Sequence, residues 1–214
     1  MATSSPMQLG MVGLGRMGSN LVQRLVRDGH RCVVYDLSTS AVSALVGERV
    51  AGASSLVDLA GQLDAPRAIW LMLPAAVTQA AIDELAGSLS EGDVVIDGGN
   101  SYYRDDIDRA RAFAGRGIHY VDCGTSGGVW GLERGYCLMF GGPDDAVAYL
   151  DPIFKALARP TEVEPVGKYG IRFTWNDGHQ HGIYSWEFLR EHCPCPDCKA
   201  SRLMGTAGSS SKPN

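Results

Sequence analysis

A glycine-rich segment near the start of the chain has the residue types and spacing of a phosphate-binding turn. Gly13, Gly15 and Gly18 stand between an apolar run and an amphipathic stretch. In that setting the first glycine allows a tight turn, the second lets the backbone approach a pyrophosphate, and the third allows a helix to pack closely on a strand. N–H groups at the helix start attract the phosphate charge. The predicted cofactor contacts are Gly13, Leu14, Gly15, Arg16, Met17 and Gly18.

Asp36 extends this prediction to the ribose. It ends an apolar, β-branched run and follows Gly18 by roughly the 20 residues at which dinucleotide-binding folds place an acid on the ribose hydroxyls. A 2′-phosphate beside this carboxylate would be repelled, so we expect NAD to bind better than NADP unless Arg16 compensates. A glycine turn without any ligand is the alternative interpretation.

Three further segments follow expected strands and supply more candidate ligand contacts. Leu73 and Pro74 end an apolar run, where they would form a wall for the cofactor or simply a buried strand end. Asn100 lies in the segment DGGNS, and Ser126 to Gly128 lie in DCGTSGGVWG. Glycines at this density let backbone N–H groups converge on an oxyanion or polyol, and Asn100 and Ser126 add side-chain hydrogen bonds. Two tight loops without a ligand are the alternative. The predicted substrate contacts are Asn100, Ser126, Gly127 and Gly128.

The cysteines near the C-terminus suggest a different chemistry. Cys193, Cys195 and Cys198 occur in the segment CPCPDC, and a fourth ligand is available from the histidines at 179, 181 and 192. Three thiolates and one imidazole make a tetrahedral zinc set. We expect structural zinc here, with free or redox-active thiols as the alternative.

Short β-type runs alternate with helical patterns from Leu9 to about Ala158, which is typical of an α/β fold with a doubly wound, mostly parallel sheet of the Rossmann type. The expected strands are Leu9 to Val12, Arg31 to Asp36, Ile69 to Leu73, Asp93 to Asp97, His119 to Asp122 and Tyr136 to Gly141. The expected helices are Ser19 to Arg27, Val77 to Leu89, Tyr102 to Ala114 and Asp144 to Leu157.

The pattern changes after Pro160, so we predict a domain boundary near Arg159. Asn176 to Gly178 is a turn between two β-rich runs, Gly170 to Trp175 and His181 to Ser185, which predicts a β-hairpin followed by a short helix over Trp186 to His192. The predicted organisation is a dinucleotide-binding domain over 1–159, a small zinc module over 160–200 and a disordered tail over 201–214.

Composition narrows the class of protein. The chain has 214 residues, of which 45% are hydrophobic and 20% are charged, and its net charge is −5. No dense cluster of Lys and Arg is present, so we expect no nucleic-acid partner. The longest apolar run is far short of the ~20 residues needed to cross a bilayer, so we expect no membrane-spanning segment. The first residues lack a secretory signal, which predicts a cytoplasmic chain with reduced thiols, and Cys32, Cys123 and Cys137 are expected to be buried.

The segments GLGRMG, WLMLP, DGGNS and DCGTSGGVWGLERGYCLMFGG resemble 6-phosphogluconate dehydrogenase, in detail its NAD-preferring bacterial branch, over roughly Met7 to Ala158. The related 3-hydroxyisobutyrate dehydrogenases share the glycine pattern but typically lack the Gly-Val-Trp-Gly extension. The resemblance implies oxidation and decarboxylation of 6-phosphogluconate to ribulose 5-phosphate. It makes Asp36 and the glycines cofactor contacts, places Asn100 near both nicotinamide and substrate, and makes Ser126, Gly127 and Gly128 substrate contacts.

The family's general base is a lysine in the setting Val-Lys-Met-Val-His-Asn-Gly, within a helical second half that also builds its dimer. Lys168, Lys199 and Lys212 do not stand in that setting. A positioned base is typically worth 10²–10⁴-fold in rate. We therefore expect weak turnover or none from this chain alone, leave oligomer formation open, and keep a non-catalytic metabolite-binding or zinc-dependent interaction protein as the alternative.

Residues 163–200 resemble part of the N-terminal zinc module of gamma-butyrobetaine hydroxylase, through the segments GIYSWEFLR and CPCPDC. That resemblance implies that Cys193, Cys195 and Cys198 bind zinc together with a histidine matching His179. It implies no hydroxylation, because the oxygenase's iron-binding domain has no counterpart in the sequence.

Overall fold

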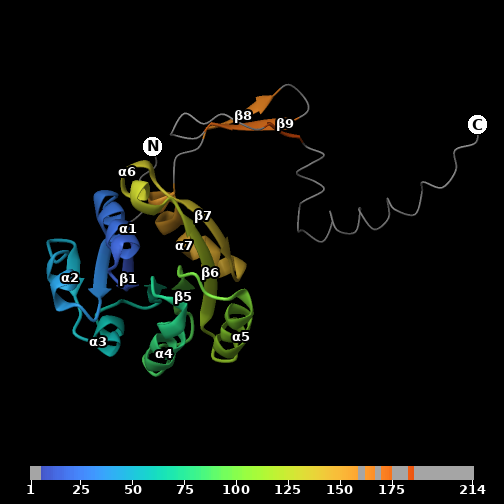
Figure 1. The fold of residues 1–214 in the computed structure, drawn as a ribbon. Helices are drawn as coiled ribbons and strands as arrows, with labels where there is room; N and C mark the ends of the chain where they lie inside the picture. The colour runs from blue at the N-terminus through green and yellow to red at the C-terminus, as the bar shows by residue number, and fades with distance from the viewer. Residues whose placement is uncertain (1–5, 159–161, 167–169, 175–182, 186–214) are drawn as a thin grey trace, which may run out of the picture. The chain divides into compact units, whose positions relative to one another are not determined.

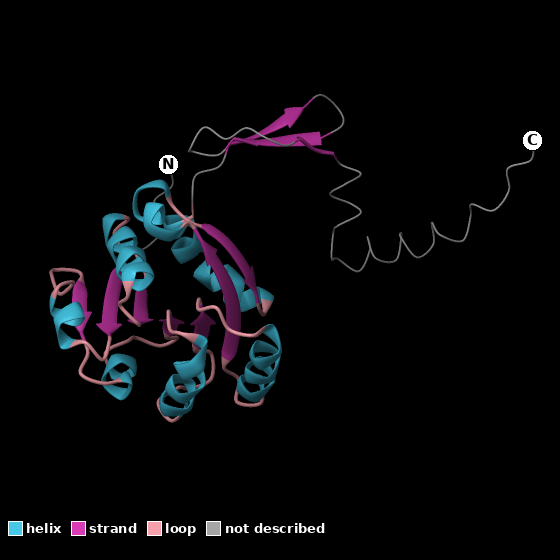
Figure 2. Ribbon diagram, viewed as in Figure 1, coloured by secondary structure: helices cyan, strands magenta, loops and turns pink. Residues whose placement is uncertain are grey.

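The computed structural model describes residues 6–158, 162–166, 170–174 and 183–185. The chain divides into two units, residues 1–159 and 160–214. The first unit is built on one seven-stranded sheet (Figures 1 and 2). Its strands are β1 (Gln8–Val12), β2 (Arg31–Tyr35), β3 (Val50–Gly52), β4 (Ala68–Leu71), β5 (Val94–Asp97), β6 (His119–Ser126) and β7 (Cys137–Gly141).

The strands follow the order β3-β2-β1-β4-β5-β6-β7. The first six are parallel and β7 is antiparallel to β6. The chain winds outward from β1 to β3, returns to the middle at β4 and then winds the other way. In such sheets the crevice for ligands opens at the carboxyl ends of the strands where the winding direction reverses, here between β1 and β4.

Helices cover both faces of this sheet. They are α1 (Arg16–Arg27), α2 (Thr39–Ser43), α3 (Leu56–Gly61), α4 (Ala75–Ala86), α5 (Tyr103–Ala114), the short 3₁₀ turn η1 (Gly128–Trp130), α6 (Gly131–Arg134) and α7 (Asp144–Leu157). Figure 1 shows α3, α4 and α5 side by side along one face, with α1 and α7 on the other. None of the helices in the described part of the chain is long and apolar enough to cross a membrane.

The core has two layers because side chains alternate across the sheet. Trp70 lies in the layer toward α1 and α7, where it is fully buried and meets Phe154 edge to face at 6.2 Å. Its neighbours Ile69 and Leu71 lie in the layer toward α3, α4 and α5. Burial of each such side chain contributes about 1.5–3 kcal/mol. These strands are apolar on both faces, as expected for a sheet covered by helices on both sides.

The α/β fold predicted from the alternating pattern is confirmed, with several differences. The η1 turn and α6 lie between two expected strands, where we expected no helical element. Residues 37–67, where we expected no element, contain α2, β3 and α3, which are too short to give a clear period. The strand expected to end at Asp122 runs on to Ser126, because pairing with β7 from Asp122–Gly141 to Ser126–Cys137 continues the hydrogen-bonded ladder. Cys32 and Cys123 are buried as predicted, but Cys137 is exposed. It lies on β7, the edge strand of the seven-stranded sheet as far as the structure describes the chain.

The second unit contains a three-stranded antiparallel sheet of β8 (Glu162–Val166), β9 (Gly170–Thr174) and β10 (Ile183–Ser185). The expected pair of strands is present as β9 and β10. We did not expect β8, whose sequence contains Pro165. A proline has no N–H to donate to a ladder and is therefore tolerated on an edge strand, which β8 is in the order β10-β9-β8. The predicted turn at 176–178, helix at 186–192 and tail at 201–214 lie outside the described residues.

Candidate cofactor-binding site

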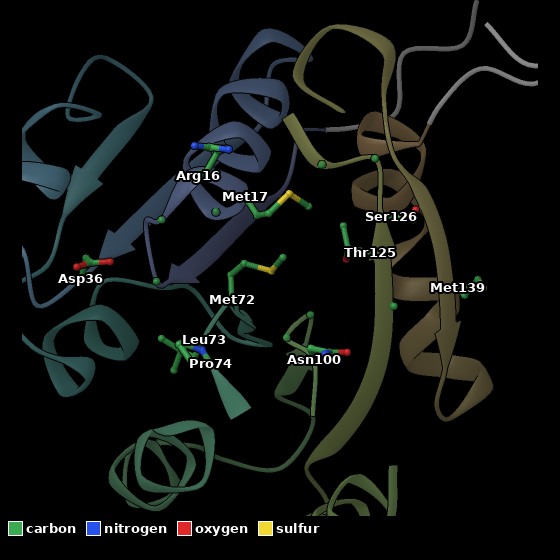
Figure 3. A pocket seen from close by; sticks show the side chains of 18 residues that line it. Arg16, Met17, Asp36, Met72, Leu73, Pro74, Asn100, Thr125, Ser126 and Met139 are labelled. Atoms are coloured by element: carbon green, nitrogen blue, oxygen red, sulfur yellow. The ribbon is translucent and has the colours of Figure 1, made fainter. Parts of the chain in front are cut away.

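A cavity of about 930 Å³ opens at the carboxyl ends of the parallel strands (Figure 3). It lies where the winding of the sheet reverses. Its lining residues are Gly13, Gly15, Arg16, Met17, Gly18, Asp36, Met72, Leu73, Pro74, Gly98, Gly99, Asn100, Gly124, Thr125, Ser126, Gly127, Gly128 and Met139. Every candidate cofactor and substrate residue in the first unit lies on this cavity except Leu14. The Leu14 side chain is buried in the core instead.

Each of the three glycines between β1 and α1 has a position where a side chain would strain the backbone, clash with the protein or fill open space. Gly13 has φ +92°, and a Cβ there would lie 2.5 Å from the carbonyl oxygen of Met72. A Cβ on Gly18 would overlap the carbonyl oxygen of Gly13. Gly15 differs, because no atom of the protein lies within 4 Å of its Cβ position. Gly13 and Gly18 therefore shape the turn, whereas Gly15 keeps a space open beside the cavity.

Helix α1 begins with its backbone donors uncapped. Gly15 is its N-cap residue, no side chain caps the helix, and its first turn contains no acidic residue. Arg16 is the first residue of the helix, and Figure 3 shows Arg16 and Met17 extending from this end of α1. N–H groups, the positive end of the helix dipole and a guanidinium thus lie together at the rim of one cavity. This arrangement suits a phosphate group.

Asp36 lies just after β2 and is half-buried. One carboxylate oxygen, Oδ2, accepts a hydrogen bond from the Leu14 N–H at 2.7 Å, and Oδ1 accepts one from the Ser38 N–H at 2.8 Å. A carboxylate has about four acceptor positions, so about two stay available for hydroxyl groups of a ligand. The glycine turn is tied to the same strand, because the Gly13 N–H donates to the Tyr35 carbonyl at 2.9 Å.

Apolar side chains line the cavity between its Asp36 end and its Asn100 end (Figure 3). Met72, Leu73 and Pro74 follow β4 and line it. A second cavity of about 400 Å³ shares Gly13, Asp36, Leu73 and Pro74 with the first. Its other lining residues are Val12, Tyr35, Leu37, Leu56, Val77, Ala80, Ala81 and Glu84. The side chains of this second cavity are mostly apolar, which suits a flat aromatic ring such as adenine.

The far end of the cavity is built from the loop after β5 and from the β6–β7 pair. Asn100 lies on the loop, and Figure 3 shows its side chain reaching toward β6, which carries Thr125. Gly127 and Gly128 have φ values of +143° and +50°. Both values favour glycine, so the turn out of β6 keeps its backbone accessible to a ligand.

Sequence reasoning missed Met139. This residue is on the cavity because the antiparallel register places it opposite Gly124, a pairing between distant parts of the chain. A strand was predicted over Tyr136 to Gly141, but nothing in its sequence specified the neighbouring strand or the register. Gly124, Thr125 and Met139 all lay within the motif DCGTSGGVWGLERGYCLMFGG, but none of them was singled out.

The lining residues provide few groups for acid–base chemistry. Arg16 and Asp36 are the ionisable side chains on the first cavity. Both lie near the glycine turn between β1 and α1, away from Asn100. Cys123 precedes the lining residue Gly124, but burial raises the pKa of its thiol to about 12. This thiol is therefore protonated near neutral pH. The lining residues around Asn100 can bind and orient a ligand, and none of them has an ionisable side chain that could act as a general base.

The predicted zinc ligands Cys193, Cys195, Cys198 and His179 lie outside the described residues. Within the ranges that the structure does describe, no group of three His, Cys, Asp or Glu side chains could hold a metal ion.

Residues 8–169 match the family model described as the NAD binding domain of 6-phosphogluconate dehydrogenase. A curated relative, the NAD(+)-dependent, decarboxylating 6-phosphogluconate dehydrogenase of Haloferax volcanii, is 42% identical over 176 residues, which cover 82% of this chain and 53% of the relative. The chain therefore spans about half the length of that enzyme.

Two solved structures share the fold. The 6-phosphogluconate dehydrogenase of Plasmodium falciparum, studied in its apo form, with its cofactor NADP+ and with its substrate 6-phosphogluconate, superposes with a TM-score of 0.66 at 26% identity, over 71% of this chain and 34% of that one. The 3-hydroxyisobutyrate dehydrogenase of Salmonella typhimurium superposes with a TM-score of 0.64 at 28% identity, over 71% of this chain and 54% of that one. The match over residues 8–169 decides the assignment: this chain belongs to the family of 6-phosphogluconate dehydrogenase NAD-binding domains.

Proposed function

We propose that this chain binds NAD in the cavity at the carboxyl ends of β1, β4, β5 and β6, and that it binds NADP more weakly. One observation carries the proposal: a single cavity joins the uncapped start of α1, the Asp36 carboxylate and the Asn100 loop. The start of α1 would bind the central pyrophosphate, Asp36 the adenosine ribose on one side of it, and the Asn100 loop the nicotinamide on the other side. The second, apolar cavity beside Asp36 has the character expected of an adenine site.

The preference for NAD rests on charge. The Asp36 carboxylate repels a 2′-phosphate. Arg16 lines the first cavity together with Asp36, but it is the first residue of α1, where the pyrophosphate is proposed to bind. No Lys or Arg lines either of the two other cavities beside Asp36, which are the second cavity and one formed by Tyr35, Asp36, Leu37, Thr39, Val42, Ser43, Gly52, Ala53 and Ser54. The NAD(+)-dependent relative from Haloferax volcanii supports the same choice.

The proposed substrate is a sugar acid such as 6-phosphogluconate, and NAD, when bound, supplies the hydride acceptor. Asn100, Ser126, Gly127 and Gly128 would hold the substrate, with Thr125 as a further hydroxyl on the same cavity. The family match and the substrate of the Plasmodium falciparum enzyme support this choice.

We propose that turnover by this chain alone is slow or nil. The lining residues around Asn100 contain no base, and none of the lysines after residue 160 stands in the family's base motif. A non-catalytic protein that binds NAD and a metabolite is the second candidate function, and this lack of a base among the lining residues favours it. Removing a general base typically costs 10²–10⁴-fold in rate.

The test is calorimetric titration of the whole chain with NAD and NADP, followed by an assay of NADH formation with 6-phosphogluconate. We expect NAD to bind with the higher affinity and NADH formation to be slow or undetectable. Failure to bind either nucleotide would refute the proposal. NAD binding with rapid turnover would show that a base outside the described lining residues completes the site, and would reject the non-catalytic candidate.

We also propose that residues 160–200 form a zinc module, with Cys193, Cys195, Cys198 and His179 as ligands. The donor set of three thiolates and one imidazole supports it, because this set is typical of structural zinc. A small segment with little core of its own gains stability from such a metal.

A further inference from the structure

A buried carboxylate lies beneath the loop that carries Asn100. Asp97 is the last residue of β5 and is 1% exposed. Its Oδ1 accepts a hydrogen bond from the Gly99 N–H at 2.9 Å, and its Oδ2 accepts one from the Ser101 hydroxyl at 2.7 Å. Gly99 and Ser101 flank Asn100 in the chain. One carboxylate therefore binds the backbone N–H of the residue before Asn100 and the side-chain hydroxyl of the residue after it.

Helix α5 and strand β6 hold this carboxylate in turn. Arg109 Nη1 lies 3.2 Å from Asp97 Oδ2, and the Tyr120 hydroxyl lies 3.1 Å from the same oxygen. Arg109 Nη1 also donates to Asp106 at 3.0 Å, while its Nε donates to Gln79 on α4 at 2.9 Å. The position of the Asn100 loop is thereby linked to α4, α5 and β6.

The opposite side of the loop is held by packing. The Gly98 N–H donates to the Leu71 carbonyl at 2.9 Å, and a Cβ on Gly98 would overlap the indole of Trp70. A Cβ on Gly99 would lie 2.6 Å from the Leu73 carbonyl oxygen. The loop thus fits between the end of β4 and the Asp97 carboxylate, with little room for a shift.

Such a network is costly for stability alone. Two carboxylates and one guanidinium are buried together, and each buried ion costs several kcal/mol before its partners compensate. Burial raises the pKa of Asp106, and burial together with the nearby carboxylates raises that of the Tyr120 hydroxyl. Apolar residues of the same volume often stabilise a core equally well. Because the network lies beneath the loop that carries Asn100, we interpret its role as fixing the position of that loop.

We propose that Asp97 is a positioning residue, which sets the Asn100 side chain at the nicotinamide end of the cavity by holding Gly99 and Ser101. The inference rests on the proposed function, because it assigns Asn100 to the nicotinamide end of NAD. It adds that the contact depends on a carboxylate that itself lies outside the cavity.

The test compares NAD with ADP-ribose, which lacks nicotinamide, in titrations of the whole chain. We expect Asn100→Ala to weaken NAD binding roughly 5- to 10-fold, the value of about one hydrogen bond, and to leave ADP-ribose binding unchanged. Asp97→Asn replaces one carboxylate oxygen by an amide N–H₂ group, which cannot accept the hydrogen bonds that Asp97 now accepts. It should therefore weaken NAD binding to a similar extent and leave ADP-ribose binding unchanged. The double variant should lose no more than the larger single loss, because both changes remove the same contact.

Asp93→Asn is the matched control. Asp93 precedes β5 at its other end, is also fully buried, and also accepts hydrogen bonds from an arginine and two backbone N–H groups, those of Arg67 and Ser90. It does not line the cavity. We expect it to lower stability and to leave the ratio of NAD to ADP-ribose affinity unchanged.

The outcomes separate the two proposals. If the unmodified chain binds neither NAD nor ADP-ribose, the proposed function fails, and this inference fails with it. If both ligands bind but Asp97→Asn weakens them equally, or the double variant is additive, Asp97 is only structural and the inference is wrong. Should Asp97→Asn not fold, Ser101→Ala removes a single hydrogen bond to Asp97. It should then give a selective loss of roughly 2- to 5-fold, and an unchanged ratio would overturn the inference.

Discussion

The Asp36 carboxylate accepts a hydrogen bond from the Leu14 N–H at 2.7 Å, so the acid after β2 and the glycine turn after β1 form one unit. The bond turns one oxygen of Asp36 toward the turn and fixes the carboxylate beside the cavity. Leu14 therefore contributes its backbone to the site while its side chain packs in the core. A ligand that bridges the turn and Asp36 meets a preformed surface.

Asp36→Ala should narrow the preference for NAD over NADP. The change removes acceptors for the ribose hydroxyls and removes the like-charge repulsion that a 2′-phosphate would meet. We expect NAD affinity to fall roughly tenfold or more, and NADP affinity to fall less or to rise. Titration with both nucleotides measures the ratio. Asp64→Ala is the control, because it removes the same charge at an exposed residue outside the cavities. An unchanged ratio in Asp36→Ala would reject the role of Asp36.

Gly15→Ala should separate binding from folding. A Cβ at Gly15 meets no protein atom within 4 Å, so the melting temperature should stay the same, while the methyl group enters the space proposed for the pyrophosphate. We expect NAD affinity to fall at least about tenfold.

Gly61→Ala provides the comparison for that variant. A Cβ at Gly61 also meets no atom within 4 Å, but this glycine is the last residue of α3 and is away from the cavity. It should bind NAD normally and gain up to about 1 kcal/mol of stability. Equal NAD affinity in the two variants would show that the pyrophosphate does not bind at Gly15.

His30 predicts a pH-dependent loss of stability. Its ring is buried, Nδ1 accepts from the Met7 N–H at 3.0 Å, and burial lowers its pKa from 6.5 despite Asp28 at 3.6 Å from Nε2. The folded state therefore takes up this proton less readily than the unfolded state. The His30 contribution is present above pH 6.5 and is lost as pH falls through the folded pKa.

Chemical denaturation from about pH 7 to about pH 5 measures this effect, which is at most about 1.4 kcal/mol per pH unit. His30→Asn keeps an acceptor near the Met7 N–H and removes the titration. We expect the unfolding free energy of the variant to fall less steeply with pH than that of the unmodified chain. Parallel curves would mean that His30 does not contribute.

Metal removal should affect the second unit alone. If Cys193, Cys195 and Cys198 bind zinc, the purified chain should contain about one zinc ion, and Cys193→Ser should reduce this amount. Cys137→Ser, a change at an exposed cysteine of the first unit, should retain the metal. We expect a chelator to leave NAD affinity unchanged, because the cavity residues all belong to the first unit. Metal-free protein from a zinc-supplemented preparation would contradict the zinc module.

Local features of the sequence were enough to predict the glycine turn that forms one end of the cavity. The glycine spacing at 13, 15 and 18 reflects steric limits within one turn, and the alternation of strands and helices reflects burial on both sides of a parallel sheet. Both signals act over a few residues. The cofactor end of the cavity could therefore be predicted before any coordinates were known. The predicted substrate residues, Asn100 and 126–128, also lie on the cavity, because the segments that contain them follow recognisable strands within a few residues.

Only the tertiary structure decided how distant residues meet. Met139 reaches the cavity through the β6–β7 register, and Asp97 meets Arg109 and Tyr120 through the packing of α5 on the sheet. His30 is buried, and its ring accepts a hydrogen bond from the Met7 N–H, 23 residues away in the chain. Hydrogen-bond partners across strands and helices depend on the order and register of elements that are far apart in the chain, and no local period records that order. The sequence by itself thus determined the chemistry available at each strand end, and the sheet topology decided which of these ends act together.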